Sequence, residues 1–208
     1  MKKLISSFIL IFCLSAQAEF SASGDLVSTY VFRGGMLADA PSIQPSVDIG
    51  VGSFGFNVWG SFAVSDRDVT KAADELDFTP TYSMEMAAFD LTLGYIYYLT
   101  LDNTDGSTSE IMADVSLKAA PLAFTFYYDI DLVKDFYASA SYELSLPMFT
   151  FGATAGYHNS VSSMHFDFSV AREFGLGSIT LSPYAVYSMS GEDINADNEF
   201  FLGVSFGF

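Results

Sequence analysis

The chain contains two histidines, and His158 has a spacing that could activate a nucleophile. It lies two residues before Ser160, and side chains two apart on a strand share a face. An imidazole beside a hydroxyl can act as its general base, and some membrane enzymes that hydrolyse lipids use such a His-x-Ser pair. Val161 does not continue that pattern. Apolar and polar residues alternate along this segment, and His158 falls on its polar face, whereas a site that acts on lipid must lie on the apolar face. We therefore expect no enzyme, and a lipid hydrolase is the least favoured alternative.

Acidic residues form the second candidate site, because many of them share one face of the predicted strands. Carboxylates on a low-dielectric wall attract cations, and acidic rings favour cation passage. Alternatively, these acids pair with bases across the interior or face bulk water at its rims. The residues predicted to line a pore are Asp25, Arg33, Asp48, Trp59, Asp77, Glu85, Asp114, Lys118, Asp129, Asp131, Glu143, Asp167 and Arg172.

Three of the inward side chains have more than one reading. Arg33 is one of few cations among these acids, so we expect it to pair with two or more carboxylates. It could grip a solute at a constriction or brace the barrel wall. Trp59 could stack on a ring-bearing solute or fill the interior as bulk. His165, near Asp167, is expected to be an interior residue rather than a catalyst.

Cofactor and nucleic-acid binding lack sequence signals. No Cys or His cluster suggests zinc, no loop has the full calcium-binding spacing, and no segment resembles a nucleotide-binding loop. We expect no metal and no cofactor. The formal net charge of −17 argues against nucleic acid as a partner, because neutralising phosphates requires clustered Lys and Arg.

The first eighteen residues predict a secretory signal peptide. Lys2 and Lys3 precede the apolar run Leu4–Leu14, and Ala16-Gln17-Ala18 supplies small residues for cleavage after Ala18. Cleavage removes Cys13, the only cysteine, so the mature domain, residues 19–208, forms no disulfide. That domain keeps six basic and 25 acidic residues, a net charge of about −19.

High hydrophobicity and high acidity occur together in the mature chain. Half of the residues are hydrophobic, with 21 Phe and 12 Tyr, which is too aromatic for a disordered chain. No stretch after Ala18 reaches the roughly 18 apolar residues of a membrane helix. The apolar and charged side chains must therefore point into different media, and a period-two arrangement achieves this.

This alternation recurs along the chain and predicts an all-β protein. A typical segment places Ile43, Val47 and Ile49 opposite Gln44, Ser46 and Asp48. We predict a transmembrane antiparallel up-and-down β-barrel of about 12 strands, within a range of about 10 to 14. The first strand is expected to run through Arg33, and Pro45, Pro80 and Pro183 are expected to mark bulges or strand ends.

Turn lengths and the C-terminus give the predicted barrel its orientation. Phe206 and Phe208 end an alternating segment that is typical of the signal read by the outer-membrane assembly machinery. An even strand count puts both termini on the periplasmic side. Short periplasmic turns are expected near Gly52-Ser53, Ala88, Pro121, Pro147 and Gly175, and longer outer loops at 34–40, 65–74, 101–108, 158–162 and 189–197.

The order of several short motifs resembles the TorF-type porin family. The motifs are Ser28-Thr-Tyr-Val-Phe-Arg-Gly34, Pro41-Ser-Ile-Gln44, Gly55-Phe-Asn-Val-Trp-Gly-Ser61 and Leu93-Gly-Tyr-Ile-Tyr-Tyr98. They cover roughly residues 24–117, and the rest of the chain matches only by pattern. The resemblance implies an outer-membrane barrel of porin type and identifies no solute.

The leading hypothesis is an outer-membrane channel for passive diffusion of small polar or cationic solutes through an acidic lumen. A structural or adhesive barrel with a filled lumen is the first alternative, and the lipid hydrolase is the second. Expected partners are outer-membrane lipids, the barrel-assembly machinery, periplasmic chaperones and small polar solutes.

Overall fold

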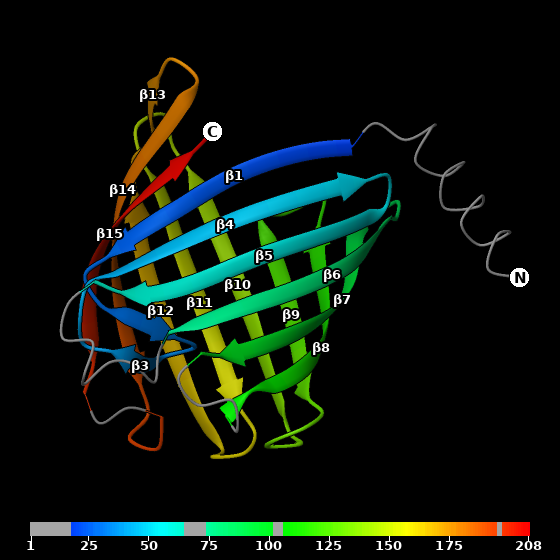
Figure 1. Ribbon diagram of the computed structural model, residues 1–208, viewed down its shortest axis with the longest axis vertical. Coiled ribbons are helices and arrows are strands. Elements are labelled where there is room, and N and C mark those ends of the chain that lie inside the picture. The colour runs from blue at the N-terminus through cyan, green and yellow to red at the C-terminus, as the bar shows by residue number, and fades with distance from the viewer. Residues whose placement is uncertain (1–17, 65–73, 102–105, 195–196) are drawn as a thin grey trace, which may run out of the picture.

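Twelve long antiparallel strands form a closed barrel (Figure 1). A computed structural model describes residues 18–64, 74–101, 106–194 and 197–208. The wall strands are β1 (Ala18–Val27), β4 (Ser42–Val51), β5 (Phe54–Ala63), β6 (Glu75–Glu85), β7 (Phe89–Thr100), β8 (Thr108–Leu117), β9 (Leu122–Asp129), β10 (Phe136–Ser145), β11 (Thr150–His158), β12 (Ser163–Ala171), β14 (Ile179–Ser190) and β15 (Glu199–Gly207).

The barrel closes because both ends of the sheet find partners. β1 pairs with β15, and β12 pairs with β14, so every wall strand has two antiparallel neighbours. Closure leaves no unpaired strand edge. The predicted all-β antiparallel barrel of twelve strands is confirmed. Among the described residues, no helix is long and apolar enough to cross a bilayer.

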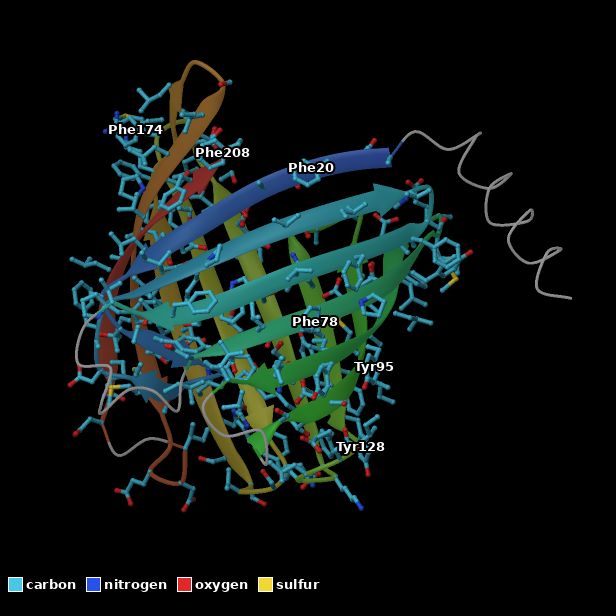
Figure 2. The ribbon with its side chains drawn as sticks, in the orientation of Figure 1. Phe20, Phe78, Tyr95, Tyr128, Phe174 and Phe208 are labelled. Carbon is cyan, nitrogen blue, oxygen red and sulfur yellow. The ribbon has the colours of Figure 1, made fainter. Side chains whose placement is uncertain are left out.

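Burial in this protein is inverted relative to a water-soluble domain. Large apolar side chains are exposed on the outer surface, including Leu93 (44%) and Ile111 (49%), whereas Ser42, Gln44 and Glu110 are buried inside. Figure 2 labels six aromatic side chains of the wall strands and rims. The apolar-out, polar-in alternation is typical of barrels that meet lipid.

Five tyrosines of the wall strands face outward. Tyr95, Tyr97, Tyr128, Tyr142 and Tyr187 are all exposed, which suits the aromatic girdles of a membrane barrel. The C-terminal segment also has the expected phase, with Phe200, Leu202 and Phe208 exposed and Gly203 buried.

Four short turns lie where the sequence predicted them, whereas the turn expected near Gly175 lies at Gly177-Ser178. The expected bulges at proline are wrong at two sites. Pro45 pairs with Gly24 on β1, and Pro80 pairs with Phe56 on β5. On its other side, each proline interrupts the ladder without shifting the register. A missing N–H removes one ladder bond, and the intact pairs on either side hold the alignment. Pro183 lies one residue beyond the last β12–β14 pair, Ala171–Tyr184.

Two short hairpin strands depart from the wall. β1 ends at Val27, so the expectation that it runs through Arg33 is wrong. The chain instead forms β2 (Tyr30–Phe32) and β3 (Gly35–Ala38), which pair with each other (Figure 1). Tyr30, Ala38 and Ala40 are buried. The hairpin therefore folds into the barrel at the end opposite Ala18 and Phe208. A third short strand, β13 (Phe174–Leu176), extends β14 at the end that holds those two residues.

Several expectations fall on parts of the chain outside the described residues. The predicted signal peptide, residues 1–18, lies outside them except for Ala18, where β1 begins. Its cleavage stays a prediction. The predicted loops 65–74 and 101–108 lie largely outside the described residues as well.

Candidate functional site in the barrel lumen

The tip of the β2–β3 hairpin is a two-residue turn. Arg33 has φ +50° and Gly34 has φ +80°, and Phe32 pairs with Gly35 across the turn. Two central residues with positive φ define the type I′ turn, whose twist matches that of a hairpin. Arg33 occupies a conformation that is uncommon for a residue with a side chain, so its contacts must hold it there.

Arg33 anchors the tip to the opposite wall by a bidentate ion pair. Its Nη1 donates to Glu110 Oε1 at 2.8 Å and its Nη2 to Oε2 at 2.7 Å. The two side chains are only 12% and 10% exposed. The guanidinium also lies over the rings of Tyr127 at 4.0 Å and Tyr137 at 4.5 Å, a favourable cation–π arrangement.

The environment keeps Arg33 charged. Burial acts to lower the pKa of the guanidinium, but the hydrogen bond and charge of Glu110 and the neighbouring phenols raise the pKa above its ordinary value. Among the described residues, Arg33 is bonded to one carboxylate rather than to the two or more expected. Glu110 is the carboxylate bonded to Arg33, and its Oε2 also accepts from Tyr98 Oη at 2.8 Å.

The backbone of the tip is held by side chains from two further strands. His158 Nε2 donates to the Arg33 carbonyl oxygen at 2.8 Å, and Ser190 Oγ donates to the Gly34 carbonyl oxygen at 2.6 Å. A Cβ placed on Gly34 would lie 2.5 Å from His165 Cβ. Only glycine therefore fits this position, both for space and for its positive φ. We call His158, His165 and Ser190, which contact the hairpin tip, the hairpin seat.

His165 packs directly against Gly34. It is 1% exposed, its ring stacks on Tyr137, and its Nε2 lies 3.0 Å from the Tyr137 hydroxyl. Its Nδ1 lies 3.1 Å from Asp167 Oδ2. The prediction of an interior histidine beside Asp167 is confirmed.

The His-x-Ser pair is divided between two environments. His158 ends β11 and bonds to the hairpin inside the barrel, whereas Ser160 is exposed in the turn after it. The imidazole is therefore engaged by the hairpin backbone and does not face the outer, apolar surface.

Tyr30 ties the hairpin to the other side of the lumen. Its hydroxyl donates to Glu75 Oε1 at 2.5 Å, and its ring lies 5.8 Å from that of Trp59. Burial, together with the charge of Glu75, raises the pKa of the Tyr30 phenol far above its ordinary value, so it stays a neutral donor. The hairpin thus spans the lumen from β5 and β6 to β8 and β12.

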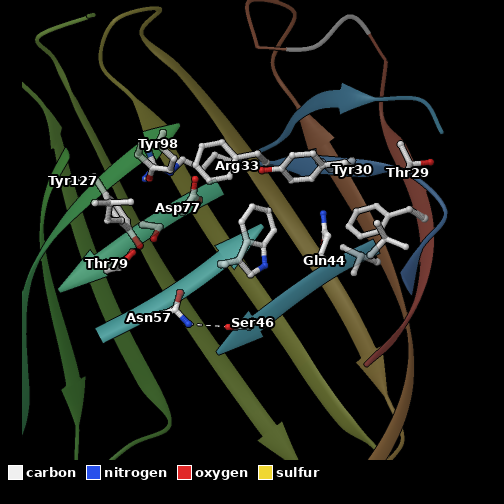
Figure 3. Close-up of a pocket in the computed structure, with 18 of the residues that line it drawn as sticks. Thr29, Tyr30, Arg33, Gln44, Ser46, Asn57, Asp77, Thr79, Tyr98 and Tyr127 are labelled. Carbon is white, nitrogen blue, oxygen red and sulfur yellow. Dashed lines mark hydrogen bonds between the residues drawn. The ribbon is translucent and has the colours of Figure 1, made fainter. Parts of the chain in front are cut away.

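A cavity of about 660 Å³ lies in the lumen beside the hairpin (Figure 3). Hairpin residues Tyr30 and Arg33 border it on one side. Trp59 and Asp77 border it from the wall, together with the polar side chains of Gln44, Ser46, Asn57, Thr79 and Ser139. Trp59 is therefore placed inside, as expected, and can contact whatever enters this space.

Four of the predicted inward carboxylates accept hydrogen bonds from neighbouring strands. The donors to Asp48, Asp114 and Asp167 lie at 2.8, 2.7 and 2.5 Å. The bonded pairs are Asp25 with Ser205, Asp48 with Asn57, Asp114 with Thr125, and Asp167 with Ser188. Glu143 accepts from Ser145 at 3.4 Å and Glu85 is exposed, each in the last part of its strand.

Two residues predicted to line a pore lie past the ends of the strands, whereas Asp129 is the last residue of β9 and pairs across the sheet with the inward Glu110. Asp131 is exposed in the turn after β9, and Arg172 follows β12, with its guanidinium 4.8 Å from the Phe174 ring. Asp129 Oδ1 accepts backbone N–H groups from residues 131–134 and so stabilises that turn. The errors share one cause, because the alternation was continued past the ends of the strands. Lys118 follows β8 and pairs with Asp90 at 2.9 Å.

Sequence reasoning missed several residues of the hairpin and of its contacts. Glu110 precedes the outward Ile111, so the alternation already placed it inside, and it could have been found. A first strand that ran through an inward Arg33 would place Tyr30 on the outer face, because the two residues are an odd number of positions apart. Ser190 carried no sequence signal for its bond to Gly34. Within the described ranges, no group of three His, Cys, Asp or Glu side chains is arranged to hold a metal ion.

Known structures with a similar fold are outer-membrane proteins. A KdgM porin has a TM-score of 0.60 at 10% identity over 90% of this chain and 98% of its own. A NanC porin has 0.55 at 12% identity, covering 91% and 99%. The outer membrane phospholipase A from Escherichia coli has 0.51 at 10% identity, covering 90% and 89%. At these identities, the similarity is one of fold.

The sequence comparisons give one match. No curated protein sequence matches the chain significantly. One family model matches residues 14–204 and carries the name Gcw_chp, so the expected TorF-type name is not confirmed. Because the match covers nearly the whole chain, the protein belongs to Gcw_chp, a family of bacterial proteins of unknown function.

Proposed function

We propose that this protein is an outer-membrane channel for passive diffusion of small polar or cationic solutes. The observation that carries the proposal is the closed barrel with an apolar exterior and a polar cavity in its lumen. An apolar belt suits lipid, and polar side chains inside suit a hydrated path. The fold similarity to the KdgM and NanC porins supports the same function.

The proposed selectivity follows from the inward charges. Asp25, Asp48, Asp77, Asp114 and Asp167 lie on the lumen side of the wall strands, and each would attract cations. Arg33 is the main opposing charge, and Glu110 already balances it. We propose a preference for cations and neutral polar solutes over anions.

The hairpin narrows this path. It crosses the lumen at one end of the barrel and is fixed on both sides, by Glu75 and by Glu110. We therefore propose a small conductance, with the path running between the hairpin and the wall formed by β4 to β6. Export through the signal peptide, and insertion guided by Phe206 and Phe208 through chaperones and the assembly machinery, belong to the same proposal.

Planar-bilayer recording of the refolded mature chain tests the channel. We expect small single-channel current steps. In a salt gradient, we expect a reversal potential with the sign of a cation-selective channel. A reversal potential with the sign of an anion-selective channel would refute the proposed selectivity. An absence of conductance would refute the proposed channel function.

A structural barrel with a filled lumen is the second candidate, and the hairpin itself favours it. If the hairpin fills the bore, neither the wild type nor a variant with a loosened hairpin tip would conduct. Lipid hydrolysis gains no support from the position of His158, whose Nε2 is bonded to the Arg33 carbonyl oxygen.

A further inference from the structure

Asp77 differs from four other inward carboxylates in its hydrogen bonding within the described residues. It is 9% exposed, and its Oδ1 is buried with no hydrogen-bond partner in the part of the chain that the structure describes. Asp25, Asp48, Asp114 and Asp167 each accept a hydrogen bond from a neighbouring strand. Burying a charged, unpaired carboxylate is unfavourable unless a cation or a donor joins it or the group takes up a proton.

The residues on either side of Asp77 are aromatic. Within the sheet, Asp77 pairs directly with Trp59 of β5 and with Tyr98 of β7, so all three side chains point into the lumen at one level. Tyr30 adds a third ring, 5.8 Å from Trp59. All four residues border the 660 Å³ cavity, and Figure 3 labels Tyr30, Asp77 and Tyr98 around it. Aromatic faces attract cations that have shed water.

The local charge also favours a cation. Three carboxylates, Glu75, Asp77 and Glu110, lie around this part of the lumen, and Arg33 is the guanidinium beside them. Arg33 is bound by Glu110, and Glu75 accepts from Tyr30. Asp77 is left as the carboxylate available to a bound ligand.

We propose that the cavity beside the hairpin binds a small organic cation, with its ammonium group on Asp77 and against the rings of Trp59, Tyr98 and Tyr30. This binding site would be the place where the channel recognises its solute, so the inference rests on the proposed channel function. A volume of 660 Å³ falls within the range of about 300 to 1,000 Å³ for small-molecule sites. Gln44, Asn57 and Thr79 supply hydrogen-bonding groups for the polar part of the ligand.

An organic ammonium suits this site better than a metal ion. Hard metal cations require several oxygen ligands at short distances, whereas Asp77 provides one carboxylate between aromatic rings. A quaternary or substituted ammonium is weakly hydrated and gains from ring faces.

Trp59 makes the proposal testable without any measurement of flux. It is the only tryptophan of the chain, so fluorescence excited selectively from tryptophan, rather than from the 12 tyrosines, reports on this cavity. The refolded mature chain, in a detergent with a sugar headgroup, would be titrated with choline chloride. Potassium chloride at equal concentration and 3,3-dimethylbutan-1-ol, the uncharged isostere of choline, are the ligand controls.

We expect a saturable change in Trp59 emission with choline and none with either control. Asp77→Asn keeps the side-chain shape and removes the charge, and it should weaken choline binding by about tenfold or more. Asp131→Asn is the matched control, because it removes the same charge from an exposed residue in the turn after β9, outside the cavity. It should bind choline like the wild type. A shift in gel mobility between unboiled and boiled samples (heat modifiability) would verify that both variants fold.

Equal responses to choline and to the isostere, or to choline and to potassium, would overturn the cation site. So would unchanged binding in Asp77→Asn. Choline binding without conductance would instead retain the site and refute the channel, so the two proposals fail separately.

Discussion

Gly34→Ala would test whether the fit of the hairpin tip keeps it docked across the lumen. Gly34 has φ +80°, and an added Cβ would lie 2.5 Å from His165 Cβ and 2.6 Å from Ser190 Oγ. A left-handed conformation costs an L-residue about 1 to 2 kcal/mol, and overpacking a tight site costs about 1 to 3 kcal/mol. The docked state should therefore lose about 2 to 5 kcal/mol. Since 1.4 kcal/mol is a factor of ten, the undocked fraction should rise by about 30-fold or more.

Two measurements follow the hairpin. Acrylamide quenching of Trp59 should increase in Gly34→Ala, because undocking removes Tyr30 from its 5.8 Å contact with the indole. Single-channel conductance should increase in the same variant, because the hairpin leaves the bore.

Gly35→Ala is the matched control. Gly35 lies outside the set of positive-φ residues, and an added Cβ would approach the Phe32 carbonyl oxygen no closer than 3.4 Å. We expect quenching and conductance near those of the wild type. If Gly34→Ala and Gly35→Ala behaved alike in both assays, the reasoning about the seat would be wrong.

Three further predictions concern the anchor, the wall and the C-terminus. Glu110→Gln leaves the Arg33 guanidinium buried without its counter-charge, which costs about 3 to 5 kcal/mol, and Trp59 quenching should rise as in Gly34→Ala; unchanged quenching would count against the ion pair as an anchor. Leu93→Arg places a charge on the outer belt and should lower the free energy of unfolding in lipid vesicles by about 2 to 4 kcal/mol, measured by urea titration, whereas the inward Thr92→Arg should have a much smaller effect. Deletion of Phe208 should reduce the amount of barrel assembled in the outer membrane of cells without changing refolding in detergent, and equal reductions in both would point to lost stability instead.

The regular part of this fold could be predicted from local sequence. Alternation assigns each side chain to the lipid or lumen face without knowledge of its neighbours, because successive residues on a strand point to opposite sides. Exposed Leu93 and Ile111 and inward Asp114 follow from it. The same rule places Glu110 of β8 on the lumen face, because Glu110 directly precedes the outward Ile111.

The alternation fails at strand ends, and that explains most of the errors. Asp131 and Arg172 continue the pattern of the strand before them, yet lie in turns. A period-two pattern does not contain the position at which pairing stops. That position depends on the neighbouring strand and on turn contacts, such as the four N–H groups that converge on Asp129.

Sequence alone therefore predicted an antiparallel barrel of about twelve strands with an apolar exterior. Only the tertiary structure decided that residues 28–40 leave the wall and cross the lumen. Their alternation is compatible with a longer first strand, and the contacts that draw them inward come from far along the chain, from Glu110, His158 and Ser190. The same folding decides which carboxylates accept hydrogen bonds and leaves Asp77 Oδ1 without a hydrogen-bond partner among the described residues, because pairing across a barrel depends on distances that no local pattern encodes.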